Sequence, residues 1–279
     1  HLTNRRQRQM CIRDRLHRQL THPTGLDPQM TFTILGHDPV ADQTGIGIAT
    51  VSLAVGGLCP FMTLSGDLIT SQAYARQEVG LHMARRITDG AEWEVIMAEL
   101  ASRDPYLANR QIGVVRRDGT LHAHSGTDCR PWTGHQFGEH CVVMGNFLSG
   151  EQVLPAMADA FAAAKAEPLA ERLLQALEAG RDAGGQADAA GRHHTERSAG
   201  LKVVGGGGVS GIDDRAVAPI DFRVDMHDRA VDELRRLYRT MHKVPGYNAL
   251  RSSNPPGTPG LAAWESTELT DPAPPNPVQ

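Results

Sequence analysis

The feature that most constrains the fold of this chain is its hydrophobic pattern, in which strand-like stretches alternate with helix-like stretches in a particular order. Residues 31–36 and 47–55 alternate or run apolar, and the turn cluster between them, from Asp38-Pro39 to Thr44-Gly45, is typical of a hairpin. Strand-like stretches recur at 61–73, 111–115, 121–124 and 141–144, and Asp118-Gly119 predicts a hairpin with a type I′ turn. Residues 201–204 and 220–224 return to strand character.

Helical spacing separates these blocks and comes mostly in pairs. Residues 79–87 and 91–100 form the first pair, and two amphipathic helices follow at 154–164 and 169–177. A last helix over 231–241 is expected to begin with Asp228 as its N-cap. Because strict β-α-β alternation is absent, the pattern predicts an α+β fold built from antiparallel sheets. Two sheets faced together, with helical pairs outside, would bury every apolar face.

The two ends of the chain differ in composition from its middle. Residues 1–29 contain six arginines and two aspartates, with no apolar segment long enough for a signal peptide. Within them, Met10-Cys11-Ile12-Arg13-Asp14-Arg15 resembles the conceptual translation of a sequencing adapter, which predicts a non-native, disordered leader. A basic arm that binds nucleic acid is the alternative. The Pro-rich residues 247–279 predict a disordered tail. Residues 30–246 then form the single expected domain.

Charge and cysteine usage narrow the classes of function. The whole chain has a formal net charge of −4, and without residues 1–29 this becomes −8, which offers no electrostatic footprint for nucleic acid. No run approaches about 18 apolar residues, so no membrane span is predicted. Cys59, Cys129 and Cys141 are widely spaced and lack a paired motif, which favours a reducing cytoplasm. The sequence leaves the oligomeric state open, and base rates for soluble proteins are compatible with a homodimer.

Met30-Thr31 has the form of a translation start inside the longer chain. If the methionine is removed, Thr31 carries a free α-amine beside its own hydroxyl and so becomes a self-contained nucleophile and base. This predicts an amidohydrolase that cleaves a small amide or short peptide through an acyl-enzyme on Thr31 and needs no cofactor. The alternative is that Thr31 is an ordinary β-branched residue that opens a strand.

Four further residues are candidates to support Thr31. Asn146 follows a strand and could present its amide to an oxyanion, although it could equally be a turn asparagine. Thr33 lies two residues from Thr31 and shares its face of the strand, so it could orient the amine; the alternative is an ordinary β-forming residue. Gln72 and Thr50 are weaker candidates, since both could be polar residues on the wet face of a strand.

Two other functions remain open from the sequence. The first is a metal-dependent hydrolase, because His122 and His124 share a strand face and His193-His194 are adjacent, but no dense zinc-ligand signature accompanies them. The second is a catalytically silent binding or scaffold protein on the same fold. Cys141 lies in an apolar strand, where a thiol is normally an inert small hydrophobe.

Several strings spread over about residues 30–240 resemble, in their shared order, the domain of unknown function 1028 family. The strings are Thr31-Phe32-Thr33-Ile34, Asp38-Pro39, Gly45-Ile46-Gly47-Ile48-Ala49, Ala54-Val55-Gly56, Ser71-Gln72-Ala73-Tyr74, Gln111-Ile112-Gly113-Val114-Val115, Pro131-Trp132-Thr133-Gly134-His135, Gly145-Asn146, Pro168-Leu169-Ala170-Glu171-Arg172-Leu173-Leu174 and Asp213-Asp214-Arg215-Ala216-Val217. The resemblance implies an N-terminal-nucleophile (Ntn) hydrolase-like fold, a four-layer αββα sandwich of two antiparallel sheets. It leaves the substrate open. The chain departs from the family pattern at Ser65-Gly66-Asp67, where a glycine-rich apolar strand is expected.

Overall fold

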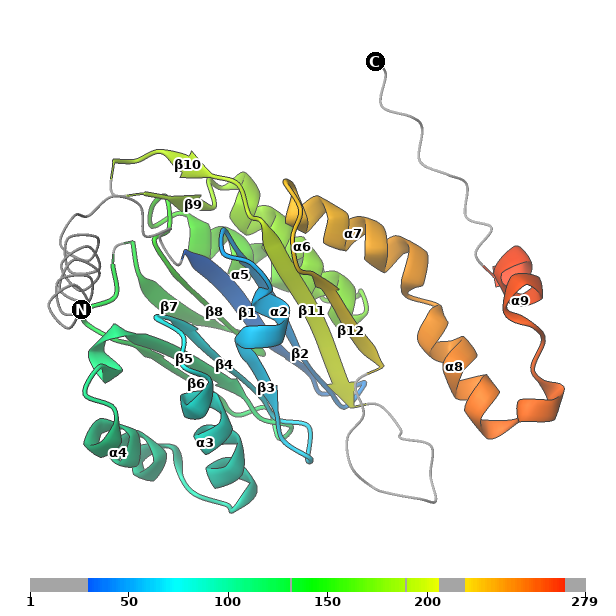
Figure 1. Cartoon of the computed structure of the whole chain (residues 1–279), viewed down its shortest axis with the longest axis horizontal. Coiled ribbons are helices and arrows are strands. Elements are labelled where there is room, and N and C mark those ends of the chain that lie inside the picture. Colours follow the sequence, from blue (N-terminus) through cyan, green and yellow to red (C-terminus); the bar gives the residue numbers. More distant parts are fainter. Residues whose placement is uncertain (1–29, 131, 189, 206–218, 269–279) are drawn as a thin grey trace, which may run out of the picture.

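Two antiparallel sheets face each other in the computed structural model, which describes residues 30–130, 132–188, 190–205 and 219–268 (Figure 1). The larger sheet has the strand order β12-β11-β2-β1-β8-β7, and the smaller has the order β3-β4-β5-β6. The strands of the larger sheet are β1 (Thr31–Asp38), β2 (Gln43–Thr50), β7 (Gly134–Gly138), β8 (Cys141–Asn146), β11 (Ser198–Gly205) and β12 (Ile220–Val224). Those of the smaller sheet are β3 (Pro60–Met62), β4 (Leu68–Ala73), β5 (Arg110–Val115) and β6 (Leu121–Ser125). The expected α+β class with antiparallel sheets is therefore confirmed.

The central hairpin β1–β2 follows directly from its sequence pattern. The carboxylate of Asp38 accepts hydrogen bonds from the backbone N–H groups of Val40 and Ala41, at 2.9 and 3.0 Å, and so closes the turn. Both strands are buried on both faces, and alternation along β1 assigns Phe32 and Ile34 to one face and Thr31, Thr33 and Leu35 to the other. The second face is directed toward the smaller sheet.

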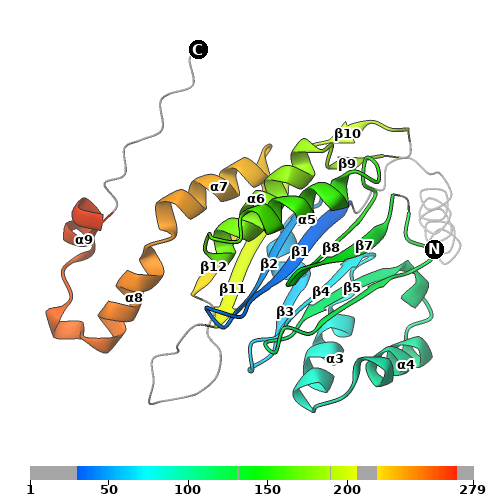
Figure 2. The same cartoon turned by 180° about the vertical axis from the view of Figure 1, so that it is seen from behind.

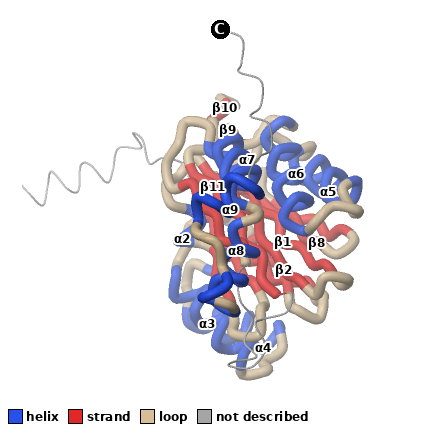
Figure 3. Tube along the Cα trace, turned by 90° about the vertical axis from the view of Figure 1, so that its right-hand side faces the viewer, coloured by secondary structure: helices blue, strands red, loops and turns tan. Residues whose placement is uncertain are grey.

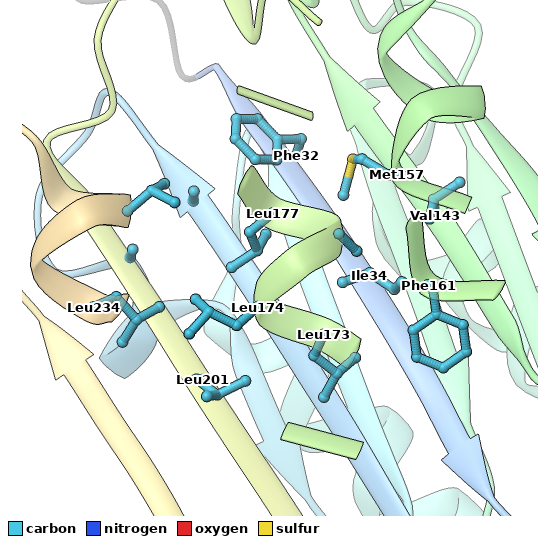
Figure 4. Close-up of a cluster of buried hydrophobic side chains, with 14 of the residues drawn as sticks. Phe32, Ile34, Val143, Met157, Phe161, Leu173, Leu174, Leu177, Leu201 and Leu234 are labelled. Atoms are coloured by element: carbon cyan, nitrogen blue, oxygen red, sulfur yellow. The ribbon is translucent and has the colours of Figure 1, made fainter. Parts of the chain in front are cut away.

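Helices cover the outer face of the larger sheet. These are α5 (Val153–Ala163), α6 (Leu169–Asp182) and α7 (Ala230–Met241), and Figure 2 shows them lying across the strands. Their apolar faces meet the sheet in one cluster, which includes Phe32, Phe161, Leu173 and Leu177 (Figure 4). A Cβ on Gly45 would lie 2.4 Å from a methyl of Leu173, so a glycine is needed where α6 approaches the strand.

Helices α3 (Gln77–Thr88) and α4 (Trp93–Arg103) cover the outer face of the smaller sheet (Figure 1). Their core consists of Ile69, Val79, Met83, Ile87, Ile96, Leu100, Ile112 and Val114. A separate cluster fills the space between the two sheets and consists of Leu35, Ile46, Leu68, Val115, Val142, Met144 and Val204. Figure 3, seen from the side, shows the sheets between these two groups of helices.

Several short elements complete this arrangement. They are α2 (Val55–Leu58), the 3₁₀ turns η1 (Leu107–Asn109) and η2 (Pro255–Gly257), and the small hairpin β9 (Gln186–Ala187) with β10 (His193–His194). One of them, α2, packs on the larger sheet through the contact of Val55 with Ile48. The sequence pattern predicted neither the β9–β10 hairpin nor β7. Strands β9 and β10 have two residues each, which cannot display a period, and the five residues of β7 are largely exposed and contain no apolar alternation.

Two local predictions are wrong. Residues 61–73 do not form one strand, because a turn separates β3 from β4. The carboxylate of Asp67 stabilises this turn by accepting hydrogen bonds from the hydroxyls of Thr63 and Ser65 at 2.7 and 2.8 Å. The family departure at this position is thus a turn. Helix α7 begins at Ala230 after Arg229, and no side chain caps it, so Asp228 is not its N-cap.

Part of the expected disordered tail is helical. Helices α8 (Val244–Ser253) and α9 (Leu261–Glu268) lie within or next to residues 247–268. The ring of Tyr247 packs on Trp264 with 4.8 Å between ring centroids, and its hydroxyl donates to the carbonyl of Pro259 at 3.1 Å. This aromatic contact offsets part of the ordering entropy that the Pro-rich composition implies. The expected leader, residues 1–29, and residues 269–279 lie outside the described part of the chain.

None of the helices in the described part of the chain is both long and apolar enough to cross a lipid bilayer.

Candidate functional site

Polar side chains occupy one end of the space between the sheets, and apolar side chains fill the other. Thr33, Gln72, Gln111 and Asn146 are at most 1% exposed, and Thr31 is 4% exposed. The strand register explains why they meet: Thr31 pairs with Asn146 on β8, and Gln72 pairs with Gln111 on the facing sheet. Residues from four strands of two sheets therefore converge in a buried polar cluster.

Gln111 holds this cluster together and fixes the direction of its hydrogen bonds. Its amide nitrogen donates to the carbonyls of Gly134 and Gly145, each at 2.9 Å, so that end must be the NH₂ group. Its amide oxygen then accepts from the side-chain nitrogens of Gln72 at 2.9 Å and Asn146 at 3.1 Å. Gln111 was not among the site residues predicted from the sequence. A signal was present, because Gln111 is the polar residue of the predicted strand over 111–115, whose other residues are apolar or glycine.

Gln72 carries the network back to the larger sheet. Since its nitrogen faces Gln111, its oxygen accepts from the hydroxyls of Thr33 at 2.6 Å and Thr70 at 3.1 Å. The hydrogen bond between Thr33 and Gln72 crosses from one sheet to the other. The predicted candidates Thr33, Gln72 and Asn146 thus belong to one network, joined through Gln111.

Asn146 is the one member of the cluster that keeps an unused polar atom. Its amide nitrogen is committed to Gln111, and its oxygen Oδ1 is buried with no hydrogen-bond partner among the described residues. A buried acceptor without a donor costs roughly 1–3 kcal/mol, and such atoms need an explanation. The group that Asn146 offers to this space is therefore an acceptor, whereas the sequence analysis expected it to offer a donor.

Thr31 and Thr50 form a second hydrogen-bonded pair beside this network. The hydroxyl of Thr31 donates to the hydroxyl of Thr50 at 3.2 Å, and the hydroxyl of Thr50 donates in turn to the backbone carbonyl of Met30. Thr50 lies opposite Thr31 in the β1–β2 register, at the end of its strand. One hydroxyl therefore connects the side chain of Thr31 with the carbonyl of the peptide bond that precedes Thr31.

Met30 is fully buried and packs with Val51 and Phe147 in a small apolar cluster of its own. Phe147 directly follows Asn146, and Val51 directly follows Thr50. The seat of Met30, defined here by Val51 and Phe147, therefore adjoins both polar residues that flank Thr31.

One histidine borders this site, since the ring of His135 contacts the hydroxyl of Ser125 at 3.0 Å and that hydroxyl accepts from the amide nitrogen of Gln111 at 2.9 Å. The histidines and the cysteine that the sequence singled out make their contacts elsewhere. His122 stacks on Trp93 with 4.8 Å between the rings, and burial lowers its pKa. His194 contacts Asp188 at 3.4 Å in the β9–β10 hairpin. Nowhere in the described ranges do three metal-ligating side chains come together. Burial raises the pKa of the Cys141 thiol to about 11, which is typical of an unreactive cysteine.

A cavity of about 270 Å³ lies next to the ends of β4 and β5 and is lined by Tyr74, Tyr106, Asn109 and Arg110. Arg110 is one residue from Gln111, but alternation directs it to the other face of the strand. Its guanidinium pairs with the buried carboxylate of Asp104 at 3.0 Å. This pairing lowers the pKa of Asp104, mainly through the hydrogen bond from Arg110.

The comparisons with known proteins agree on one family. Residues 31–234 match the model of a family described as being of unknown function, DUF1028. The crystal structure of protein SPO2555 from Silicibacter pomeroyi, which is assigned to the same family, is similar with a TM-score of 0.63 and 28% sequence identity over 76% of this chain and 89% of that one. A search of curated proteins finds no match. Because the family model covers well over half of its length, this chain belongs to the DUF1028 family.

Proposed function

We propose that this chain is an amidohydrolase of the Ntn class, with Thr31 as nucleophile and the α-amine of Thr31 as general base. The observation that carries the proposal is the hydrogen bond from the Thr31 hydroxyl to Thr50, at the start of a central strand and between two sheets. Asn146, which pairs with Thr31 in the strand register, continues this polar environment to Gln111 on the facing sheet, and a threonine that only opened a strand would need no such surroundings. The class of substrate is a small amide or a short peptide.

The layering supports the same class. Two antiparallel sheets with helices on their outer faces are the arrangement that a four-layer αββα sandwich of the Ntn type requires (Figure 1). A fold alone does not establish an activity, so the residues of the site carry the proposal.

The three free cysteines of the described residues are buried and unpaired, which favours a reducing compartment such as the cytoplasm.

In the proposed reaction the Met30–Thr31 bond has been cut, so that Thr31 is the first residue. Its hydroxyl attacks the carbonyl carbon of the substrate while the α-amine takes the proton, and the amine of the substrate leaves. Water then hydrolyses the ester on Thr31. An exposed α-amine has a pKa of about 7.7–8.0, and burial between the sheets lowers the pKa of an amine, which raises the neutral fraction at pH 7. General-base assistance is typically worth about 10²–10⁴ in rate.

The other candidates take distinct roles in this scheme. The hydroxyl of Thr50, which donates to the carbonyl of Met30, is suited to donate to the oxyanion that forms at the same place. The oxygen of Asn146 accepts an N–H from the substrate or from the amine of Thr31. Thr33 and Gln72, tied together at 2.6 Å, position the strand and the facing sheet.

The test is turnover of an amide library by the chain expressed from Met30, with intact mass spectrometry to show whether Thr31 is the first residue. Thr31→Ala is expected to lower turnover by about 10³-fold or more, because removal of a nucleophile collapses the catalytic unit. Thr88→Ala, at the exposed end of α3, is the matched control and leaves turnover unchanged. Unchanged turnover in Thr31→Ala, or a retained Met30 in an active enzyme, would refute the proposal.

A further inference from the structure

The two residues that pack against Met30, Val51 and Phe147, are held in place by hydrogen bonds and contacts of their own. The backbone of Phe147 is held on both sides, since its N–H donates to the backbone carbonyl of Arg130 at 3.2 Å and its carbonyl accepts from the backbone N–H of Ala187 at 3.0 Å. The guanidinium of Arg130 lies 5.7 Å from the centroid of the Phe147 ring. The N–H of Val51 donates to the side chain of Gln186 at 3.2 Å. These contacts hold both apolar walls whatever occupies the space between them.

The occupant is chemically an acyl group. Met30 contributes the carbonyl half of an amide whose nitrogen belongs to Thr31, and Thr50 donates a hydrogen bond to that carbonyl. In the proposed reaction the substrate forms an ester with the hydroxyl oxygen of the same threonine. The nitrogen and the hydroxyl oxygen of a threonine are separated by only two carbon atoms. An acyl carbon bonded to either therefore lies in the same neighbourhood and faces the same donor.

We propose that the seat of Met30, once vacated, binds the acyl side of the substrate, and that the preferred substrates are amides of N-acylated amino acids with an unbranched, apolar side chain of methionine size. This inference rests on the proposed function. The side chain of Met30 is 0% exposed in its seat, which shows that a chain of this length and polarity is accommodated without solvent contact. A charged or strongly polar side chain would lose its hydration there without gaining a partner.

The magnitude follows from burial. Full burial of a methionine-sized side chain is worth about 10-fold to 100-fold in affinity or in kcat/KM relative to leaving it in water. An alanine derivative fills little of the seat and forgoes most of that gain. N-acetyl-methionine 4-nitroanilide and its norleucine analogue are therefore expected to exceed N-acetyl-alanine 4-nitroanilide by about 10-fold to 100-fold in kcat/KM.

The experiment compares these three anilides on the full chain and on the chain expressed from Met30, with the N-terminal residue of each read by intact mass. Phe147→Ala is expected to reduce the ratio of methionine to alanine substrates to below about threefold, and Val51→Ala to reduce it in part. Leu81→Ala, which removes an exposed side chain of α3, leaves the ratio unchanged. Thermal melts verify that each variant is folded, and Val51→Ala carries the test if Phe147→Ala is not.

The outcomes separate the two proposals. Hydrolysis that requires Thr31 but favours alanine, or a methionine preference that survives both wall substitutions, overturns the acyl seat and leaves the proposed function standing. If the amide library is hydrolysed in a Thr31-dependent way but none of the three anilides is, the acyl seat is overturned and the proposed function stands. If neither the library nor any anilide is hydrolysed, the proposed function is refuted, and calorimetric titration of the Thr31-first protein with N-acetyl-methioninamide and N-acetyl-alaninamide tests the seat by itself. Tighter binding of the methionine compound, lost in Phe147→Ala, supports the seat; equal binding overturns it.

Discussion

Replacing Gln111 by methionine should destabilise the protein far more than replacing Asn146 by leucine, although both residues are buried in the same polar cluster. Gln111 is the hydrogen-bond partner of the side-chain nitrogens of Gln72 and Asn146. Gln111→Met leaves both buried nitrogens without an acceptor, at about 1–3 kcal/mol each, so the expected loss is about 2–6 kcal/mol. A domain of this size is stable by only about 5–15 kcal/mol.

In Asn146→Leu, by contrast, a loss and a gain in the free energy of unfolding nearly cancel. The variant loses one hydrogen bond, worth about 0.5–1.5 kcal/mol, but it also removes the buried oxygen that has no partner, which costs about 1–3 kcal/mol in the native protein. Gln111 keeps its bond from Gln72. Leucine has nearly the shape of asparagine, so packing changes little. The expected net change is within about 1 kcal/mol of zero and can be stabilising.

Urea denaturation measures the difference directly. With a slope of about 2–3 kcal/mol per M, Gln111→Met should lower the midpoint by about 1 M or more, while Asn146→Leu should leave it nearly in place. Gln152→Met is the matched control, since Gln152 is exposed and its bonds to Ser149 and the carbonyl of Ala183 lie at the surface. Equal losses in the two buried variants would refute the reasoning, because they would mean that the oxygen of Asn146 has a partner. Asn146→Leu should still lower amide turnover, since the acceptor is gone.

Three further predictions concern the rest of the molecule. Burial raises the pKa of Glu196, so the folded protein keeps this proton to higher pH than the unfolded chain does. The free energy of unfolding should therefore fall as pH rises above about 4.5, the ordinary pKa of a glutamate. Glu196→Gln should abolish that fall, as measured by urea midpoints at pH 5 and pH 7.5. Gly113→Ala would place a Cβ 2.7 Å from a methyl of Leu35 and should lower the free energy of unfolding by about 1–3 kcal/mol, as measured by thermal melting. Gly246→Ala in α8 is the control, because its Cβ would meet nothing within 4 Å, and it should be neutral or slightly stabilising. Trp264→Ala should hasten proteolysis between α7 and α9 with little change in the main unfolding transition, because its tyrosine partner ties the two terminal helices together.

The sequence predicts those parts of the fold in which neighbouring residues alone show, by their hydrophobic spacing or turn residues, which side chains are buried. The hairpin at Asp118-Gly119 and the amphipathic faces of α5 and α6 have local sequence signals, so the existence and approximate position of these elements follow from the sequence. The predicted type I′ turn is wrong, because Gly119 has a positive φ of 87° and Asp118 does not. The turn at Asp67 escaped because its stability comes from side chains that meet only after folding. The pairing of Tyr247 with Trp264 escaped for the same reason, since composition cannot show a contact between residues far apart in sequence.

The candidate site divides in the same way. Thr31 and Thr33 were predictable from their shared strand face, but the role of Gln111 depends on which strand of the second sheet stands opposite which strand of the first. The direction of each amide could only be derived once the carbonyls of Gly134 and Gly145 were known to face it.

The polar end of the inter-sheet space is itself an argument for a binding function. The other end of the same space is filled by Leu35, Leu68, Val115 and their neighbours, which shows that these two sheets pack well around apolar side chains. Apolar residues of the same volume at the polar end would avoid the desolvation of several amides and hydroxyls and would leave no orphaned acceptor. A cluster held together only for stability has no use for the free oxygen of Asn146. A site that receives an N–H donor beside the hydroxyl of Thr31 does, so stability and function should separate when that oxygen is removed.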